Sequence, residues 1–157
     1  MSTLTIEATL CAILNRNRIL LQKKSEGRFG EGKWNGVGGK LKPGEDPTKG
    51  IVREVCEETG LSIKNPRHHG VLDHYFGDRE SPAWSVHIFS TTEFEGKPME
   101  SEEGELKWFP INGIPYDDMW ADDKHWLPLL LEGKDFEGSF YFDEDAIELF
   151  DFCIITR

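Results

Sequence analysis

The chain has 157 residues, a length typical of one domain with its own core, and 29 acidic against 18 basic residues give a net charge of −11. This balance argues against a protein that coats nucleic acid, because such a protein needs a basic surface. No apolar run reaches about 18 residues, and the first five residues lack a secretory pattern, so we expect neither a membrane span nor export. Three scattered cysteines, Cys11, Cys56 and Cys153, favour reduced thiols in the cytoplasm.

The first predicted elements are two strands joined by a tight turn. Residues 4–14 are rich in apolar and β-branched side chains, residues 15–17 carry a turn signal, and residues 19–23 are predicted to return as a strand. Seven glycines fall between residues 25 and 44, which predicts a loop with special backbone demands.

A helix is expected next. Asp46 is the predicted N-cap, Pro47 suits the first helical position, and Gly60 provides a C-terminal stop. At about 100° per residue, four side chains share one arc that should face the core: Ile51, Val52, Val55 and Cys56.

The second half of the chain predicts further strands and one more helix. The helix is expected within residues 117–131, beginning near Asp122 and Asp123. Strands are predicted at residues 71–76, 85–94 and 106–109, and a closing hairpin at 138–142 and 146–155. The sum is an α+β fold, a mixed sheet with two helices packed on it, in one domain spanning residues 1–157.

Three glutamates dominate one face of the first helix. Glu54, Glu57 and Glu58 are spaced i, i+3 and i+4, and each like-charge pair at this spacing costs a few tenths of a kcal/mol. The nearby basic residues, Arg53 and Lys49, are expected to project from other sides of the helix. Hard oxygen ligands of this kind suit Mg²⁺ or Mn²⁺, whereas the alternative is an acidic face that is only solvated.

The surroundings of these glutamates form a longer pattern over residues 39–61. It consists of Gly39, Glu45, Arg53-Glu54-Val55, Glu57-Glu58 and Gly60-Leu61 at defined spacings. This string resembles the Nudix box at every defined position, an agreement expected by chance on the order of 10⁻⁹ per starting position. The resemblance implies an α/β/α Nudix sandwich. It also implies hydrolysis of a nucleoside diphosphate linked to another group, with Mg²⁺ (or Mn²⁺) stabilising the attacking and leaving oxygens around phosphorus.

The same resemblance implies roles for individual residues. Glu54, Glu57 and Glu58 become metal ligands together with the carbonyl of Gly38. The general base is Glu57, Glu58 or an acid outside the box, and within residues 100–105 we favour Glu103, also as a metal ligand, over Glu102. That segment could equally be an acidic surface loop. Glu45 and Arg53 are expected to pair and to hold the helix against the loop.

Residues 33–40 and 119–131 extend the resemblance to the oxidised purine nucleoside triphosphatases, the MutT-type enzymes that remove 8-oxo-dGTP. The similarity is much looser between residues 62 and 100. It implies that the base contacts Asn35, Trp120, Asp122 and Asp123.

The chemistry of these side chains suits a purine. Trp120 and Phe29 offer flat faces for stacking, Asn35 both donates and accepts, and two adjacent carboxyls can divide into one protonated and one ionised form. Thr9 could line the same pocket, and Lys23 or Lys24 could meet a phosphate. The alternatives are that the two aspartates only cap a helix, that Trp120 belongs to the core, and that Phe29 anchors a loop. The five histidines show no ligand spacing and receive no role.

The expected function is metal-dependent conversion of oxidised purine nucleoside triphosphates, such as 8-oxo-dGTP, to the monophosphate and pyrophosphate, which cleans the nucleotide pool. One alternative keeps the enzyme but changes the substrate to ADP-ribose, a dinucleoside polyphosphate, or a normal or methylated nucleotide. Another is a non-catalytic nucleotide-binding module. The expected partner is a nucleotide, with neither a nucleic-acid polymer nor a membrane. A monomer is favoured, although the sequence does not fix the oligomeric state.

Overall fold

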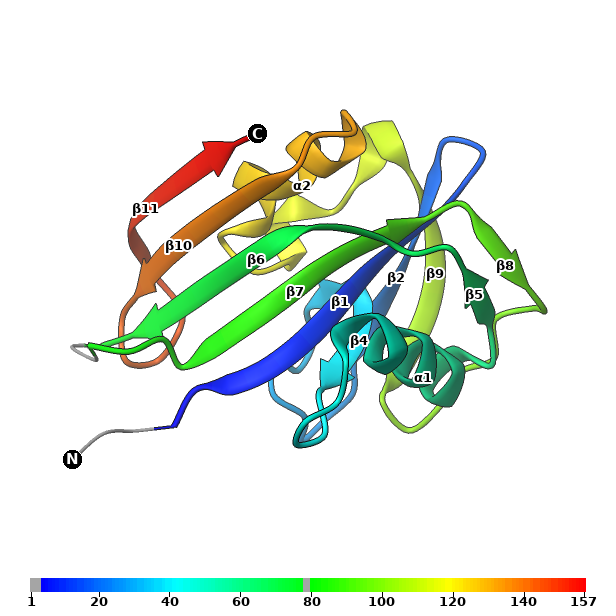
Figure 1. Ribbon diagram of the computed structural model, residues 1–157, viewed down its shortest axis with the longest axis horizontal. Coiled ribbons are helices and arrows are strands. Elements are labelled where there is room, and N and C mark those ends of the chain that lie inside the picture. Colours follow the sequence, from blue (N-terminus) through cyan, green and yellow to red (C-terminus); the bar gives the residue numbers. More distant parts are fainter. Residues whose placement is uncertain (1–3, 78–79) are drawn as a thin grey trace.

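The computed structural model describes residues 4–77 and 80–157 (Figure 1). Within them, nine strands form a mixed sheet in the order β11-β10-β6-β7-β1-β2-β3, with β4 paired to β1 and β9 paired to β2, while β5 and β8 form a separate pair. The strands are β1 (Ile6–Asn15), β2 (Arg18–Lys24), β3 (Trp34–Asn35), β4 (Val37–Lys40), β5 (Ser62–Lys64), β6 (Arg67–Phe76), β7 (Trp84–Thr91), β8 (Glu93–Glu95), β9 (Gly104–Pro110), β10 (Phe136–Phe142) and β11 (Leu149–Thr156).

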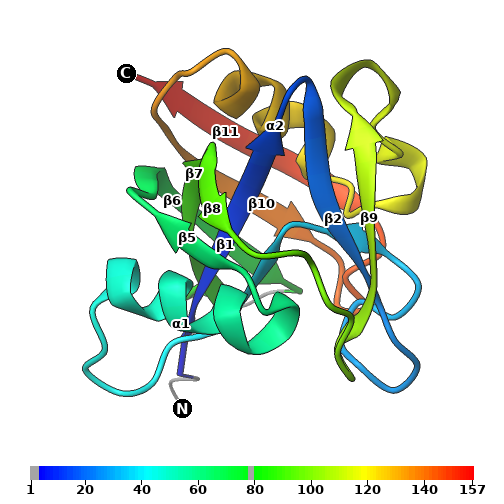
Figure 2. The same ribbon diagram turned by 90° about the vertical axis from the view of Figure 1, so that its right-hand side faces the viewer.

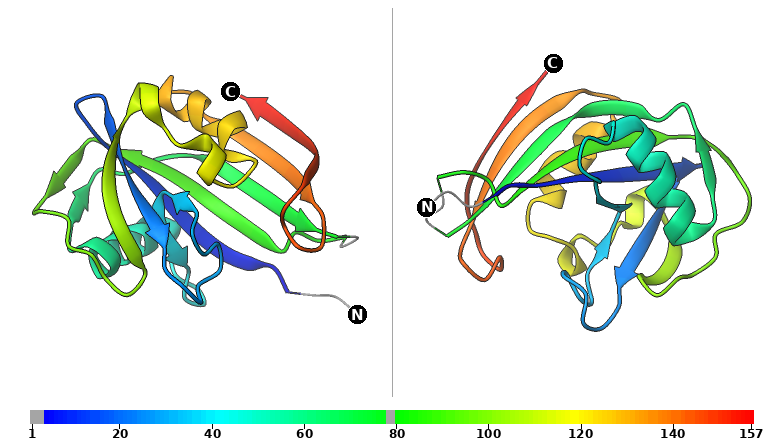
Figure 3. Two further views of the ribbon diagram at one scale, coloured as in Figure 1. Left: turned by 180° about the vertical axis from the view of Figure 1, so that it is seen from behind. Right: turned by 60° about the horizontal axis from the view of Figure 1, so that its bottom comes forward.

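Two α-helices in the described residues cover the sheet, α1 (Pro47–Thr59) and α2 (Asp123–Leu131). They lie on opposite faces of the sheet (Figures 2 and 3). Two short 3₁₀ turns, Ile111–Gly113 and Tyr116–Asp118, lead from β9 into α2. The prediction of a mixed sheet with two helices in an α+β sandwich is confirmed. No helix in the described residues is long and apolar enough to cross a membrane.

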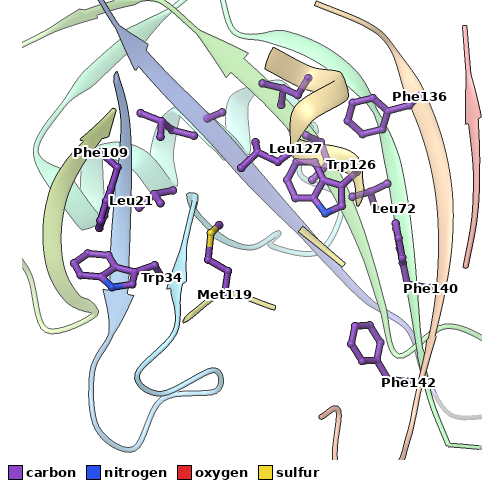
Figure 4. Close-up of a cluster of buried hydrophobic side chains, with 14 residues drawn as sticks. Leu21, Trp34, Leu72, Phe109, Met119, Trp126, Leu127, Phe136, Phe140 and Phe142 are labelled. Atoms are coloured by element: carbon purple, nitrogen blue, oxygen red, sulfur yellow. The ribbon is translucent and has the colours of Figure 1, made fainter. Parts of the chain in front are cut away.

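The protein has two hydrophobic cores, one beneath α1 and one beneath α2, and strand β1 supplies side chains to both. It pairs in parallel with β7 along most of its length and antiparallel with β2 and β4. Because successive residues of a strand point to opposite faces, Ala12 packs in the core beneath α2, whereas Cys11 and Ile13 pack in the core beneath α1. The side chains of strand β2 alternate between the two cores in the same way. In Figure 4, Trp126 and Leu127 reach from α2 into the first of these cores.

Helix α1 has the predicted ends. The Asp46 side chain accepts a hydrogen bond from the Lys49 backbone N–H, Pro47 opens the helix, and Gly60 follows with a left-handed φ of 77°. Ile51 and Val55 are fully buried, as expected.

The prediction that Cys56 faces the core was wrong, because this side chain is exposed at the edge of the apolar arc. The buried part of the helix surface is therefore narrower than the predicted apolar arc, and Val52 is only partly buried. All three cysteines are free thiols, as the sequence predicted.

The predicted strand at residues 85–94 is interrupted. Strand β7 ends at Thr91, and Glu93 begins β8, which pairs with β5 instead of continuing in the large sheet. The Thr91 hydroxyl accepts from the Glu93 backbone N–H at 3.1 Å and donates to the Lys64 carbonyl at 2.7 Å. Such side-chain hydrogen bonds compete with the strand ladder and turn the chain.

Replacement of Ile51 by alanine tests the inner face of α1. We expect Ile51→Ala to lower the free energy of unfolding by about 2–5 kcal/mol, because a fully buried side chain leaves a cavity when truncated. Cys56→Ala is the matched control on the exposed face and should change stability by less than about 0.5 kcal/mol. Urea denaturation followed by circular dichroism measures both. Equal losses in the two variants would contradict this assignment of faces.

Candidate active site

A cavity of about 590 Å³ lies where the glycine-rich loop, the sheet and both helices meet, within the size range of small-molecule sites. The acidic and the aromatic groups predicted from the sequence line this same cavity. The acidic set is Glu54, Glu57, Glu58 and Glu103, and the second set is Phe29, Asn35, Trp120, Asp122 and Asp123. Thr9, Gly38 and Gly39 line it as well.

The two glycines are required by close packing. A Cβ at Gly38 would overlap the Thr9 carbonyl across the β1–β4 pair, and a Cβ at Gly39 would overlap the Glu54 carboxylate. The Thr9 hydroxyl also donates to the Gly39 carbonyl at 3.2 Å. Because both positions are glycine, the Glu54 side chain of α1 can lie directly against the sheet.

Arg53 links the loop to the acidic face. Its Nε and Nη2 donate to the two carboxylate oxygens of Glu45 at 2.7 and 2.8 Å, which confirms the predicted pair. The expectation that Arg53 projects away from the glutamates was wrong, since Nη1 donates to Glu54 at 2.8 Å and to Glu57 at 3.0 Å. The five donors of a guanidinium allow one side chain to serve three carboxylates. This contact relieves the repulsion that the helix spacing creates.

Glu58 is the most enclosed of these glutamates, with a side chain 6% exposed. Its Oε1 has no hydrogen-bond partner and lies 3.9 Å from Lys24 Nζ. Burial raises the pKa of Glu58 to about 8, the Lys24 ammonium opposes this rise, and the nearby Glu103 and Glu54 carboxylates add to it. A buried oxygen without a partner is costly, so this position favours a cation or a proton.

The carboxylates at this site suit a hard divalent cation by their chemistry. In residues 4–77 and 80–157, however, no three carboxylate, imidazole or thiol groups stand close enough together to form a ready metal cage. Arg53 instead pairs with Glu54 and Glu57. The unpartnered oxygen of Glu58 is the strongest sign that the donor set fits a cation.

The acidic segment before β9 contributes one residue to the cavity. Glu103 lines it, whereas Glu102 does not and has a side chain 96% exposed. Lys24 Nζ lies 3.7 Å from Glu103, and Arg28 Nη1 lies 3.2 Å from it. Glu103, preferred over Glu102 from the sequence, thus stands beside the box glutamates.

Asp122 and Asp123 are both buried, at 2% and 3% exposed. Asp122 makes no side-chain cap on α2, so the capping alternative is wrong. Its Oδ2 instead accepts from Trp126 Nε1 at 2.9 Å and lies 2.9 Å from His74 Nε2. Burial raises the pKa of Asp123 well above its ordinary range, and the Asp122 charge adds to this shift. Asp123 lines the cavity, and its Oδ2 has no hydrogen-bond partner, so this atom is available to a ligand.

Aromatic rings gather at this cavity. Phe29 is 58% exposed and stacks on Trp84 with ring centroids 5.4 Å apart and planes 12° apart. Its centroid also lies 5.2 Å from that of Trp120. Trp120 meets Phe142 edge to face, so it both packs against the core and lines the cavity.

Two expectations about polar side chains have different outcomes. Asn35 lines the cavity, and its Oδ1 accepts from the Gly36 backbone N–H at 3.0 Å. Lys23 is exposed and does not line the cavity, whereas its neighbour Lys24 does. The alternation of side chains along β2 decides between the two lysines.

Sequence reasoning missed several cavity residues, among them Arg28, His74 and Trp84. Arg28 stands beside Phe29 in the glycine-rich loop, where no pattern marks it. His74 and Trp84 fall in the segment between residues 62 and 100, whose resemblance to the family is loose. The pairing of β7 with β1, and of β6 with β7, brings this segment to the site.

The chain belongs to the Nudix family, because the Nudix domain pattern matches residues 4–130. It is similar to the oxidized purine nucleoside triphosphate hydrolases of Mus musculus, at 45% identity over 88% of each chain, and of Danio rerio, at 42% identity over 85% of each chain. Among solved structures, a mutator MutT protein from Bacillus halodurans superposes with a TM-score of 0.85 at 29% identity, covering 95% of this chain and 97% of that chain.

The Glu45–Arg53 pair predicts a pH dependence of stability. The hydrogen bonds from Arg53 and then the Lys42 backbone N–H lower the pKa of Glu45 from 4.5 to about 2. Because the folded-state pKa is depressed, this carboxylate contributes stability above pH 4.5 that is lost as the pH falls toward 2. Glu45→Gln lacks that contribution at every pH. The difference in unfolding free energy between wild type and variant should therefore shrink across this window in urea titrations. A difference that stays constant would contradict the pairing.

Proposed function

We propose that this protein hydrolyses oxidised purine nucleoside triphosphates, 8-oxo-dGTP among them, to the monophosphate and pyrophosphate in the cytoplasm. One observation carries the proposal. The glutamates suited to a cation line the same cavity as Asp122 and Asp123, a buried acid pair suited to a purine base. The names of the mouse and zebrafish relatives support the substrate class.

The chain's own residues divide the work in this proposal. Glu54, Glu57, Glu58 and Glu103, with the Gly38 carbonyl, would hold Mg²⁺ or Mn²⁺. When bound, the metal supplies positive charge to the phosphate oxygens. Lys24 and Arg28, both at the cavity, add charge that suits a triphosphate. Glu57, Glu58 and Glu103 remain the candidates for the base that takes a proton from the attacking water.

The purine base of the substrate would be recognised by the second set of side chains. Trp120 and Phe29 present faces for stacking, whereas Asn35, Asp122 and Asp123 present donors and acceptors. Buried polar groups of this kind select strongly, because a base that leaves them unpaired loses their hydrogen bonds. A substrate panel including ADP-ribose, a dinucleoside polyphosphate and unmodified nucleotides separates this proposal from other Nudix activities.

Loss of one of the carboxylates proposed to bind metal should slow turnover strongly. With Mg²⁺ and 8-oxo-dGTP, wild type should form monophosphate and pyrophosphate, and Glu57→Gln should be slower by about 10²-fold or more, because several kcal/mol of charge stabilisation are lost. Chelation of the metal should have the same effect on wild type. Product separation by chromatography gives the readout. If wild type hydrolyses no nucleotide in the panel faster than Glu57→Gln does, the enzymatic proposal fails and a nucleotide-binding module is the remaining function.

Removal of the Asp122 charge should change base preference. We expect Asp122→Asn to lower kcat/KM for 8-oxo-dGTP relative to 8-oxo-dATP, whose C6 and N1 groups present the opposite donor and acceptor, by roughly tenfold or more, because the amide can place an N–H donor where the carboxylate only accepts. Asp118→Asn, at an exposed acid outside the cavity, is the matched control and should leave the ratio unchanged. An unaltered ratio in Asp122→Asn would remove this aspartate from base recognition.

A further inference from the structure

His74 stands at the acid pair although no sequence pattern marks it. It lines the cavity from β6, and its side chain is 15% exposed. The imidazole stacks on Phe140, with centroids 5.6 Å apart and planes 21° apart, and also contacts Phe142. Its Nε2 lies 2.9 Å from Asp122 Oδ2. Two aromatic neighbours therefore hold this nitrogen against one member of the pair.

Asp122 Oδ2 meets two nitrogen atoms at hydrogen-bond distance. Trp126 Nε1 is a donor only, so this oxygen already acts as an acceptor. The arrangement is fully satisfied when His74 Nε2 also carries hydrogen and donates to the same oxygen. Both bonds then require that Oδ2 carries no proton, so this oxygen presents an acceptor only.

Asp123 also meets Trp126 and the Trp120 backbone N–H, and both contacts favour its charged form. Its Oδ2 has no hydrogen-bond partner, however, and burial and the Asp122 charge oppose its charged form more strongly. The titratable groups near the pair are Lys33 and Tyr116 toward Asp123, and Lys124 and His125 on α2 itself. None of these four side chains forms a hydrogen bond with the Asp123 carboxyl. Two adjacent buried acids cannot both ionise cheaply, so their placement favours one proton held between them.

We propose that His74 is a positioning residue that keeps Asp122 as a hydrogen-bond acceptor and the shared proton on Asp123, so that the pair reads one fixed order of donor and acceptor on a purine. This inference rests on the proposed function. A 6-oxo purine presents an acceptor at C6 and a donor at N1, and a 6-amino purine presents the reverse. A pair whose proton moves freely adapts to both, whereas a pair held by His74 suits one order only, and the 6-oxo order is that of the proposed substrate 8-oxo-dGTP.

Binding of two matched monophosphates tests the inference without metal or turnover. The probes are 8-oxo-dIMP, with C6=O and N1–H, and 8-oxo-dAMP, with C6–NH₂ and a bare N1. Calorimetry should show wild type binding 8-oxo-dIMP about tenfold or more tightly than 8-oxo-dAMP. In His74→Phe, which keeps a ring against Phe140 but has no donor, the ratio of the two dissociation constants should fall by about tenfold, the effect of one hydrogen bond to a charged group.

Two further variants separate the hydrogen bond from simple packing. His74→Gln retains an N–H donor of similar reach and should preserve most of the ratio. His68→Phe removes an imidazole from the same strand outside the cavity and should leave the ratio as in wild type. Nitrogen-15 spectra of ligand-free wild type should also show hydrogen on Nε2 of His74, and a bare Nε2 would overturn the inference.

The remaining outcomes are decisive. A ratio unchanged in His74→Phe, or no preference in wild type, overturns the role of His74 even if the protein hydrolyses 8-oxo-dGTP. A wild type that binds with the expected ratio but hydrolyses nothing overturns the proposed activity and leaves the role of His74 standing. Failure of wild type to bind either monophosphate overturns base reading by the pair, and the inference with it.

Discussion

Burial of both faces of β1 is the constraint on which the rest of the structure depends. One set of its side chains packs beneath α1 and the other beneath α2, so the two helices must lie on opposite faces of the sheet (Figure 2). The β1–β4 register places Gly39 beside Thr9 and leaves room for Glu54 against the backbone. The glutamates of α1 and the two buried aspartates, Asp122 and Asp123, line one cavity together with Thr9 of this strand.

The site concentrates negative charge and offsets it in two ways. Around the box, Arg53 and Lys24 provide positive charge, and Arg53 alone reaches three carboxylates. Among residues 4–77 and 80–157 no lysine or arginine pairs with Asp122 or Asp123, and burial raises the pKa of Asp123, which favours a proton in place of a counter-ion. The first arrangement suits exchange of a side-chain cation for a metal ion. The second suits a neutral donor that meets a base.

Most of the fold followed from local patterns. The N-cap at Asp46, the stop at Gly60 and the closing hairpin were all predicted, because caps, turns and periodicity act over a few residues. The errors have physical causes of longer range. Cys56 is exposed because the sheet covers only part of the apolar arc, and β7 ends early because Thr91 bonds to Lys64 across a different strand pair.

The sequence by itself determined the helix of glutamates, the glycine pair beside it and the Nudix family, since each is encoded within a short stretch of chain. Only the tertiary structure decided which lysine reaches the cavity, how Arg53 folds over its neighbours, and that His74 meets Asp122 across 48 residues. These contacts depend on sheet register and on how α2 packs against β6 and β10. Neither leaves a periodic signal, because a single side chain brought to a site by packing needs no repeated pattern around it.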